Sequence, residues 1–563
     1  MSGLEVARET ILRALQTDQI GTPVAVRLIA HTTQDQGQIE NLASAALDTA
    51  ASWLGGHPRL LFALGGAEEG QITAALRWHG GQMALVSAGT CGTGAPLLEA
   101  LVFGNRGILS WETDRGLLLE NPAALAEQGR RNSLALDHLL AGIASKEAIS
   151  IDEQGAARRQ PNRGSTQGPA IDPFPPQQPV LRVPAERPFG VLLVAGDHTH
   201  QPGYAEALAA DERCRLVALT DTADVPPRRH DLNQRLADRL GVPLVPDLDA
   251  ALGRTDVAIA SICAEPYRRG DIAVRAAQAG KHLYLDKPLA GSKDDSQAIV
   301  RAVRDAGVVG HMFSQVHFGP SQQVRELVKS GSLGQLLAVH CDLCFAKGEA
   351  GTADLGQPRQ ETPQPDRFEL QDSKRELTNV GVYCLVQLLW ALRRRVRRVF
   401  GATGNYFFAE HQRNNMEDFG QIIMELEDGI TASITAGRAG WRSHPDSGVN
   451  RTYLIGSKAT AVVDAHRPRV EIWADVSPWL PPPRDPEDPM GMWAALPNSP
   501  FRAEPKQSWL TPGSVSWKTD AEHFLGCLEN GRQSEVSVDL AAAVSEALSA
   551  AYLSAAEGCA VEL

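Results

Sequence analysis

A lysine at the end of a predicted strand points most directly to chemistry. In AGKHLYLDKPLA (279–290) the apolar run ends at Asp286-Lys287-Pro288, where the proline stops the strand. A fixed ammonium at the mouth of a sheet can hold a substrate hydroxyl and favour its deprotonation. The alternative is an exposed lysine that follows a strand and has no further task. We favour the chemical interpretation because of the elements around this lysine.

A glycine turn at residue 196 predicts a phosphate-binding site. FGVLLVAG (189–196) is typical of a buried strand that ends at Gly196 and leads into a helix, where phosphate oxygens would meet backbone N–H groups and the helix dipole. The loop continues as GDHTHQPG, so His198 stands where a second glycine is usual, and Asp197 adds a negative charge. The order of strand, turn, helix and strand supports a dinucleotide site in spite of the altered loop.

Asp221 ends the second predicted strand of this unit, in RLVALTD. A carboxylate there can accept both hydroxyls of a ribose, which favours NAD over its 2′-phosphorylated form. Arg228 and Arg229 follow closely enough to leave NADP open. Asp221 could instead be a helix cap or a turn residue.

The elements that would position these residues alternate from Phe189 onward. Short apolar strands alternate with helices as far as GHMFSQVHF, which would add an edge strand, and this order predicts a parallel sheet with helices on both faces. After Gly334, longer strands of alternating polarity predict a mostly antiparallel sheet. The predicted fold class is an α/β Rossmann domain followed by an α+β domain with a large, mostly antiparallel sheet.

Residues 257–290, VAIASICAEPYRRGDIAVRAAQAGKHLYLDKPLA, resemble a block of the Gfo/Idh/MocA oxidoreductases, in which Glu-Lys-Pro usually stands at Asp286-Lys287-Pro288. The resemblance runs from Phe189 to the carboxy terminus. It implies a Rossmann domain at 188–318 that binds NAD, with NADP not excluded, and a substrate and oligomerisation domain at 319–563. The cofactor-binding residues that it implies are Gly196, Asp197, His198, Thr199, Asp221, Ala264, Glu265, Asp286, Lys287 and Pro288.

The helix ELTNVGVYCLVQLLWAL extends this resemblance. The family commonly has Asp-x-Gly-x-His-x-x-Asp there, whereas this chain has Asn379, Gly381, Tyr383 and Val386. The Gly-x-Tyr variant resembles the branch that contains glucose-fructose oxidoreductase and dihydrodiol dehydrogenases. It implies that Tyr383 is the acid/base, with a phenol pKa lowered by the charge of Lys287, and that Asn379 positions a hydroxyl. Tyr383 could instead be a helix residue packed under the sheet.

Three further residues are predicted to contact substrate: His317, Arg438 and Trp441. Their alternatives are a strand cap for His317 and a solvated turn for the other two. The activity implied is an NAD(P)-dependent oxidoreductase that acts on a CH–OH group, with hydride transfer between the nicotinamide and a secondary alcohol or ketone of a sugar, cyclitol or related polyol. The alternative is a family member that binds a dinucleotide or sugar without turnover.

Residues 1–154 resemble a shortened copy of the second domain. Five blocks recur in the same order: 20–30 with 333–343, 41–54 with 378–392, 59–76 with 419–437, 98–112 with 452–466, and 135–143 with 520–528. In this alignment Leu42 and Ala46 stand opposite Asn379 and Tyr383, so the additional α+β domain is predicted to be non-catalytic. An open apolar sheet face needs a partner, so the copy is predicted to cover the second sheet, within the chain or across a homo-oligomer.

Composition narrows the remaining possibilities. A Pro/Gln-rich linker is predicted at 155–187, and the net charge of −13 argues against nucleic acid or an anionic membrane as partner. Cys341 and Cys344 lie three apart on a predicted strand, so they should point to opposite faces and share no metal. His198 and His200 could bind zinc, but later strands end without histidine, and no metal is expected. Without an apolar run of about 18 residues, a cytoplasmic location is expected.

Overall fold

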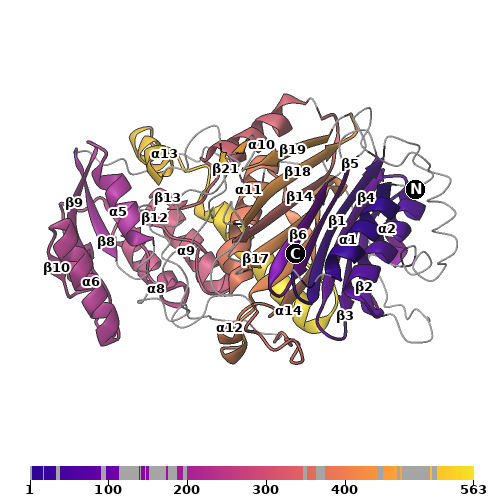
Figure 1. Cartoon of the computed structure of the whole chain (residues 1–563). Coiled ribbons are helices and arrows are strands. Elements are labelled where there is room, and N and C mark those ends of the chain that lie inside the picture. Colours follow the sequence, from indigo (N-terminus) through magenta and orange to yellow (C-terminus); the bar gives the residue numbers. More distant parts are fainter. Residues whose placement is uncertain are drawn as a thin grey trace.

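The computed structural model describes most of the chain. The described residues are 3–16, 18, 20–32, 39–90, 97–112, 139, 141, 143–145, 148–150, 173–174, 187–194, 200–331, 333–345, 351–362, 375–439, 448–458, 460–465, 469–471, 507–509 and 517–563. Figure 1 shows three units side by side, with a central sheet between a Rossmann domain and an N-terminal sheet domain. The predicted linker at 155–187 lies outside the described residues except for 173–174 and Arg187.

The Rossmann domain is a six-stranded parallel sheet in the order β10-β9-β8-β11-β12-β13. Its strands are β8 (Phe189–Val194), β9 (Cys214–Thr220), β10 (Leu244–Val245), β11 (Ile259–Ile262), β12 (His282–Leu285) and β13 (Gly310–Met312). Its helices are α5 (Gln201–Ala209), α6 (Pro227–Leu240), α7 (Leu248–Leu252), α8 (Pro266–Gln278) and α9 (Lys293–Ala306). Because β8, β11 and β12 are buried along their whole length, they read as continuous apolar runs, as the sequence analysis expected. The predicted edge strand is confirmed as β13.

The second domain is built on a seven-stranded sheet in the order β19-β18-β14-β17-β16-β15-β22. Its strands are β14 (Leu336–Phe345), β15 (Val396–Gly404), β16 (Phe419–Leu426), β17 (Thr431–Arg438), β18 (Gly448–Gly456), β19 (Thr460–Asp464) and β22 (Val561–Glu562). Only β14 and β17 pair in parallel, so the prediction of a mostly antiparallel sheet is confirmed. A separate pair joins β20 (Arg469–Glu471) to β21 (Gln507–Trp509).

Helices cover one face of this sheet. Those that contact the sheet are α10 (Gly319–Ser330), the π-helix η2 (Leu377–Gly381), α11 (Val382–Leu392) and α14 (Val538–Glu557). The domain also contains α12 (Ala409–Arg413), the 3-10 turn η3 (Glu427–Gly429) and α13 (Trp517–Glu529). By length and composition α14 could span a membrane, but 72% of that stretch is buried, where it packs against β15, α9 and α11. We therefore describe α14 as a core helix of the fold.

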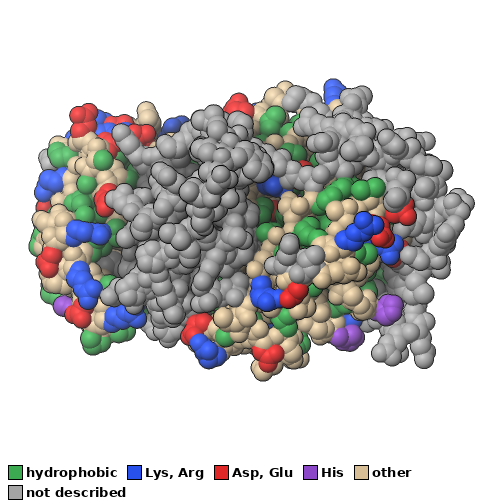
Figure 2. Space-filling model, viewed as in Figure 1, with side chains coloured by type: hydrophobic (Ala, Val, Ile, Leu, Met, Phe, Trp, Pro, Cys, Tyr) green, Lys and Arg blue, Asp and Glu red, His purple; other side chains and the backbone are tan. Residues whose placement is uncertain are grey.

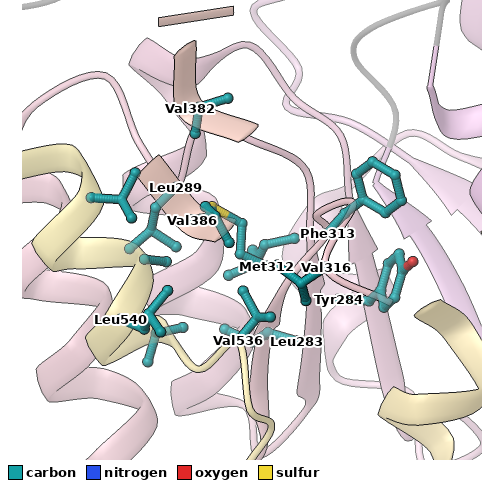
Figure 3. Close-up of a cluster of buried hydrophobic side chains, with 14 of the residues drawn as sticks. Leu283, Tyr284, Leu289, Met312, Phe313, Val316, Val382, Val386, Val536 and Leu540 are labelled. Atoms are coloured by element: carbon teal, nitrogen blue, oxygen red, sulfur yellow. The ribbon is translucent and has the colours of Figure 1, made fainter. Parts of the chain in front are cut away.

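An apolar cluster joins the Rossmann domain to the second domain. Figure 3 shows Val386 of α11 close to Leu289, with Met312 in the same group and Val382 above them, and all four side chains belong to one buried core. Val386 stands where the resemblance expects a carboxylate, and it is 1% exposed. A charge there would lie in an apolar core at high cost. The cluster fixes the start of α11 against the end of β12.

The N-terminal domain repeats the architecture of the second domain. Its elements are α1 (Gly3–Leu15), β1 (Pro23–Thr32), α2 (Ile39–Leu54), β2 (Pro58–Gly66), β3 (Gln71–Trp78), β4 (Met83–Thr90), β5 (Leu97–Gly104), β6 (Gly107–Glu112) and β7 (Ile149–Ser150). Their order is β6-β5-β1-β4-β3-β2-β7, and only β1 and β4 pair in parallel. Strand for strand, this is the order and direction of the second sheet.

The correspondence extends to single residues. An irregularity interrupts the pairing of β1 with β5 between Pro23 and Ala25, and the same interruption lies between Leu336 and Ala338 in β14 with β18. A second matching pair of irregularities lies at the start of β2 and of β15. One predicted block is wrong: 59–76 forms β2 and β3, whose counterparts are β15 and β16, not the β16–β17 hairpin at 419–437. The mismatch arises because side chains alternate between faces with a period of two in every strand, so two short hairpins of similar polarity cannot be told apart from their sequences.

The two large sheets pack face to face within the chain (Figure 1). Phe62 stacks on Phe400 with ring centroids 4.7 Å apart, and the ring centroids of Phe103 and Phe419 are 4.9 Å apart. Phe62 and Phe400 occupy equivalent places, each next to the residue that pairs with the last short strand of its sheet. Contact between equivalent residues is what a two-fold relation between the sheets would give.

A polar strip crosses this interface. Hydrogen bonds link His31 Nε2 to Ser87 Oγ (3.1 Å), Ser87 Oγ to His340 Nε2 (2.8 Å), and His340 Nδ1 to Ser433 Oγ (2.7 Å). Burial, with help from the charge of Arg27, lowers the pKa of His31 to about 3. The same two causes lower the pKa of His340. Both imidazoles are therefore neutral near pH 7.

A buried ion pair lies beside this strip. Arg27 Nε lies 3.4 Å from Asp342 Oδ1, and each side chain is 1% exposed. Burial raises the pKa of the Asp342 carboxyl, and Arg27 opposes that effect. The pair couples β1 of the first sheet to β14 of the second, because either charge alone would be costly in this interior.

Candidate active site

Lys287, Asn379 and Tyr383 come together where β12 meets α11. Lys287 follows β12 and is 4% exposed. Its ammonium donates to the backbone oxygen of Asn379 (2.6 Å) and to Oδ1 of the same residue (2.5 Å). Nζ also lies 5.0 Å from the centroid of the Tyr383 ring. The alternative of an exposed lysine after a strand is therefore wrong.

The helix that carries Asn379 begins with a π-helical segment, η2, which the sequence analysis did not foresee. Leu377 N–H donates to Glu417 Oε1 (3.1 Å), and Thr378 N–H donates to the Tyr552 hydroxyl (3.1 Å). These bonds satisfy donors that a helix start leaves unpaired. π-Helical bulges are frequent at functional sites because they displace a side chain from the regular helix face.

Glu376 extends the cluster and was missed by the sequence analysis. Its Oε2 accepts from Asn379 Nδ2 (3.0 Å), and its Oε1 accepts from Arg438 Nε (2.9 Å). Burial raises the pKa of Glu376, but Arg438, His411 and Asn379 outweigh burial and hold the pKa below its usual range. The sequence feature that could have identified Glu376 is its position three residues before Asn379, because side chains at this spacing are neighbours on a helix. Arg438, predicted to contact substrate, reaches the cluster through this carboxylate.

Arg269 holds the backbone on both sides of Lys287. Its Nη1 donates to the carbonyl of Asp286 (3.0 Å) and to that of Pro288. Its Nε and Nη2 donate to the carbonyl of Ala264 at 3.0 and 2.7 Å. This fully buried guanidinium therefore ties the end of β11 to the end of β12. In the sequence Arg269 is the second of two adjacent arginines in EPYRRGD, and nothing else in that motif indicates its role.

The Asp286 side chain is committed to the interior of the Rossmann domain. It accepts from the Tyr204 hydroxyl (2.6 Å) and contacts His200 Nδ1 (2.9 Å). Burial raises the pKa of Asp286, but His200, Arg269 and Lys287 outweigh burial and hold the pKa below its usual range. Asp286 and Pro288 were both predicted to bind cofactor, and their contacts with His200, Tyr204 and Arg269 shape the turn around Lys287.

Asp221 follows β9 at the carboxyl edge of the sheet, as predicted. Its Oδ1 accepts from Thr222 N–H and from Arg268 Nη1, and its Oδ2 accepts from Asn233 Nδ2, each at 2.8 Å. An ionised carboxylate offers about four acceptor sites, so these bonds leave capacity for a ribose hydroxyl. Arg268 was not foreseen, and it brings a positive charge to the predicted ribose site.

Glu265, the predicted cofactor residue after β11, shares that arginine. Its Oε2 accepts from Arg268 Nη2 (2.6 Å), and its Oε1 accepts from Arg229. Burial raises the pKa of Glu265, but Arg229 and Arg268 outweigh burial and lower it. Two carboxylates and two guanidiniums thus alternate along the edge between β9 and β11.

His317 lies in a different cluster. Its ring stacks on His523 at 4.1 Å and meets Trp390 edge-on at 6.3 Å. Trp390 is near the end of α11, whereas Tyr383 is near its start. The structure therefore places His317 against these two rings and not in the group formed by Lys287, Asn379 and Tyr383.

Five predicted site residues lie outside the described residues: Gly196, Asp197, His198, Thr199 and Trp441. Within the part of the chain that the structure describes, no group of three or more His, Cys, Asp or Glu side chains could hold a metal ion. Cys341 packs in the helix-side core and Cys344 in the core between the sheets, so their prediction on opposite faces is confirmed.

Comparison with known proteins agrees with this arrangement. Residues 196–314 match the oxidoreductase family with an NAD-binding Rossmann fold, and residues 321–462 match the GFO/IDH/MocA C-terminal domain. The Rossmann domain and the second domain are therefore those of the Gfo/Idh/MocA oxidoreductases.

Individual relatives are distant. A 2,7-anhydro-N-acetylneuraminate hydratase of Mediterraneibacter gnavus is 26% identical over 132 residues, which are 23% of this chain and 33% of the relative. A dTDP-3,4-didehydro-2,6-dideoxy-alpha-D-glucose 3-reductase of Streptomyces violaceoruber is 26% identical over 270 residues, 45% of this chain and 70% of the relative. The chain thus spans about a third of the length of the hydratase that it matches.

Among solved structures, GenD2 from gentamicin A biosynthesis in complex with NAD is 22% identical, with a TM-score of 0.50. The match covers 67% of this chain and 97% of that one. At this identity the likeness shows the fold.

The residues at the carboxyl edge fit NAD. Asp221, Glu265 and Lys287 each follow a strand that ends on this edge, where ligands of open α/β sheets bind. Asp221, after β9, supplies acceptors for ribose hydroxyls. Lys287, after β12, supplies a cation on the same edge of the sheet, on the other side of β8 and β11. NAD is accordingly the cofactor of this Rossmann domain.

Proposed function

We propose that the chain catalyses redox chemistry at a secondary alcohol or ketone of a sugar, cyclitol or related polyol, with NAD(P). The buried ammonium of Lys287, held by Asn379 beside the Tyr383 ring, carries this proposal. A bound nicotinamide would supply the hydride acceptor or donor. The family relationship supports an oxidoreductase, and the names of relatives such as the sugar-nucleotide reductase support a polyol-like substrate.

Each residue has a distinct task in this proposal. Lys287 binds the reacting oxygen of the substrate and stabilises its developing negative charge. Tyr383 exchanges the proton with that oxygen, because its ring lies beside the ammonium. Asn379 holds Lys287 in place and offers an amide to a neighbouring substrate hydroxyl. Substrate binding would exchange one hydrogen bond of Lys287 for a bond to the reacting oxygen.

We propose a structural task for the N-terminal domain, as a degenerate copy of the second domain. The matching strand order and irregularities support a common origin. Leu42 and Ala46, at the predicted counterparts of Asn379 and Tyr383, are buried and apolar, so α2 offers no polar group there. The domain covers the face of the second sheet opposite to its helices.

The surroundings of the chain follow from the same observations. On the face shown in Figure 2, basic and acidic side chains are interspersed among the described residues, in keeping with a small-molecule substrate and not a polyanion. No disulfide joins the described cysteines, and we propose a cytoplasmic, reducing location on that basis.

A two-stage experiment tests the proposed function. NAD and NADP are titrated into the chain while tryptophan fluorescence is followed, and we expect saturable binding. Sugars and cyclitols are then screened for turnover at the absorbance of the reduced nicotinamide. Because one relative is a hydratase, the products are also analysed for hydration without net redox change. Failure of both dinucleotides to bind contradicts the proposal. Binding without turnover of any substrate favours the non-catalytic alternative.

A further inference from the structure

We propose that Glu376 is a positioning residue that fixes the Asn379 amide and, through it, the ammonium of Lys287. The proposal rests on the function proposed above for Lys287. The described hydrogen bonds form a chain from Arg438 through Glu376 and Asn379 to Lys287. Glu376 and Arg438 sit on different elements, so this chain links the start of η2 to the end of β17.

The chemistry of Glu376 decides how the amide of Asn379 is turned. An ionised carboxylate only accepts hydrogen bonds, whereas an amide has one accepting and one donating end. Glu376 is 1% exposed, and its pKa is held low by Arg438, His411 and Asn379 against the effect of burial. The amide nitrogen must therefore face Glu376, which leaves Oδ1 for the ammonium. The opposite orientation would place two donors against each other at Lys287.

The charges around Glu376 make its role specific. Arg438 Nε lies 2.9 Å from Oε1, and His411 Nε2 lies 3.5 Å from the same oxygen. Asp418, near His411, accepts three backbone N–H groups from residues 406–408. Arg438 therefore balances the charge of Glu376, whereas the Asn379 amide transmits its hydrogen-bonding direction to Lys287.

The first test is Glu376→Gln, whose side chain can donate or accept and so no longer fixes the amide. We expect kcat to fall about 10- to 100-fold, because small displacements of a catalytic group have effects of this size. NAD affinity, followed by tryptophan fluorescence, should change less than about 2-fold. Glu535→Gln is the matched control, because Glu535 is also paired with an arginine, Arg325, and bonded to α11 through Trp390. It should leave kcat within about 2-fold.

A double-mutant cycle tests the route through the amide. If Glu376 acts through Asn379, Glu376→Gln should change kcat less than about 2-fold in an Asn379→Ala background. Effects that simply multiply would overturn the proposal. Should Glu376→Gln fail to fold, Glu376→Asp replaces it, because it keeps the charge for Arg438 and withdraws an oxygen from Asn379. Wild-type kcat in that variant would also overturn the proposal.

A measurement without cofactor or substrate separates this inference from the proposed function. The chain is labelled with ¹³C at lysine Cε, the Lys287 signal is assigned by its loss in Lys287→Arg, and its titration is followed by NMR. Removal of the nearby negative charge in Glu376→Gln should lower the pKa of Lys287 by about one unit. An unchanged midpoint contradicts the role of Glu376, whatever the outcome of the substrate screen.

Discussion

The two large sheets of the chain have the same topology, but among the described residues the candidate site lies beside the second sheet. Both sheets have seven strands in the same order with one parallel pair, and each has a helix between its first and second strands. In the second domain that helix starts with a π-helical segment and places Asn379 and Tyr383 beside Lys287. In the first domain α2 is regular and lines an apolar core. The sheet topology is thus common to both domains, whereas the helix start and the Rossmann domain contribute the residues of the candidate site.

The largest expected effect comes from Lys287, which the Rossmann domain places beside the start of the second domain's helix. Lys287→Ala should reduce kcat by about 10³-fold or more, because it removes the cation at the reacting oxygen, and leave NAD binding within a few-fold. Lys281→Ala is the matched control, since Lys281 lies at the opposite end of the same strand and donates to two backbone carbonyls. Steady-state kinetics check both variants. Full turnover in Lys287→Ala would remove the basis of the proposed function.

The next effect concerns the contact between the two large sheets. Asp342→Ala should destabilise the chain by about 3–5 kcal/mol, because it leaves the charge of Arg27 buried without its partner. Urea unfolding measures this loss. The double variant Arg27→Met/Asp342→Leu should recover much of it, since it removes both charges. Equal losses of stability in the single and the double variant would show that the ion pair does not couple the two sheets.

A pH dependence should follow from the histidines between the sheets. The pKa values of His31 and His340 are lowered by burial, so the unfolded chain takes up protons below about pH 6.5 whereas the folded chain does not. Stability should therefore fall as the pH drops below that value, by up to about 1.4 kcal/mol per unit for each residue.

Urea midpoints between pH 7.5 and 5 check this expectation. The dependence of the urea midpoint on pH should become weaker in the double variant His31→Asn/His340→Asn. His523, whose pKa burial lowers to about 3, contributes in the same direction and remains as an internal reference. Glu535 has a pKa lowered to about 2 by Arg325 and Trp390 against the effect of burial, so its contribution is lost only below about pH 4.5. A slope that the double variant leaves unchanged would place the titrating groups elsewhere.

The smallest effect on activity should come from placing a polar side chain on α2 of the N-terminal domain. Leu42→Asn should cost about 2–4 kcal/mol of stability, because the side chain is 2% exposed in an apolar core, and should leave kcat unchanged. Kinetics and urea unfolding of the same preparation measure both. A changed kcat with unchanged stability would mean that the first domain influences the site and does more than cover the sheet.

The sequence predicted the elements that depend on local pattern. The buried runs from Phe189 onward predicted the parallel sheet, and the motif around Lys287 predicted a functional lysine at its edge. The recurrence of blocks predicted a second sheet domain, although it matched 59–76 to the wrong hairpin. It could not show that α13, assigned to the second domain, returns to pack on α5, because that contact joins residues more than 300 apart.

By itself the sequence determined which segments are strands or helices and which residues can donate, accept or carry charge, because these properties follow from residue type and short-range periodicity. Tertiary structure alone decided the partners: Arg269 on the carbonyls beside Lys287, Arg268 on Asp221, and Glu376 on Asn379. Each of these contacts needs an orientation set by packing between elements that lie far apart in the chain. The role of a buried charge depends on the partner that the fold brings to it, and the residues adjacent in sequence do not identify that partner.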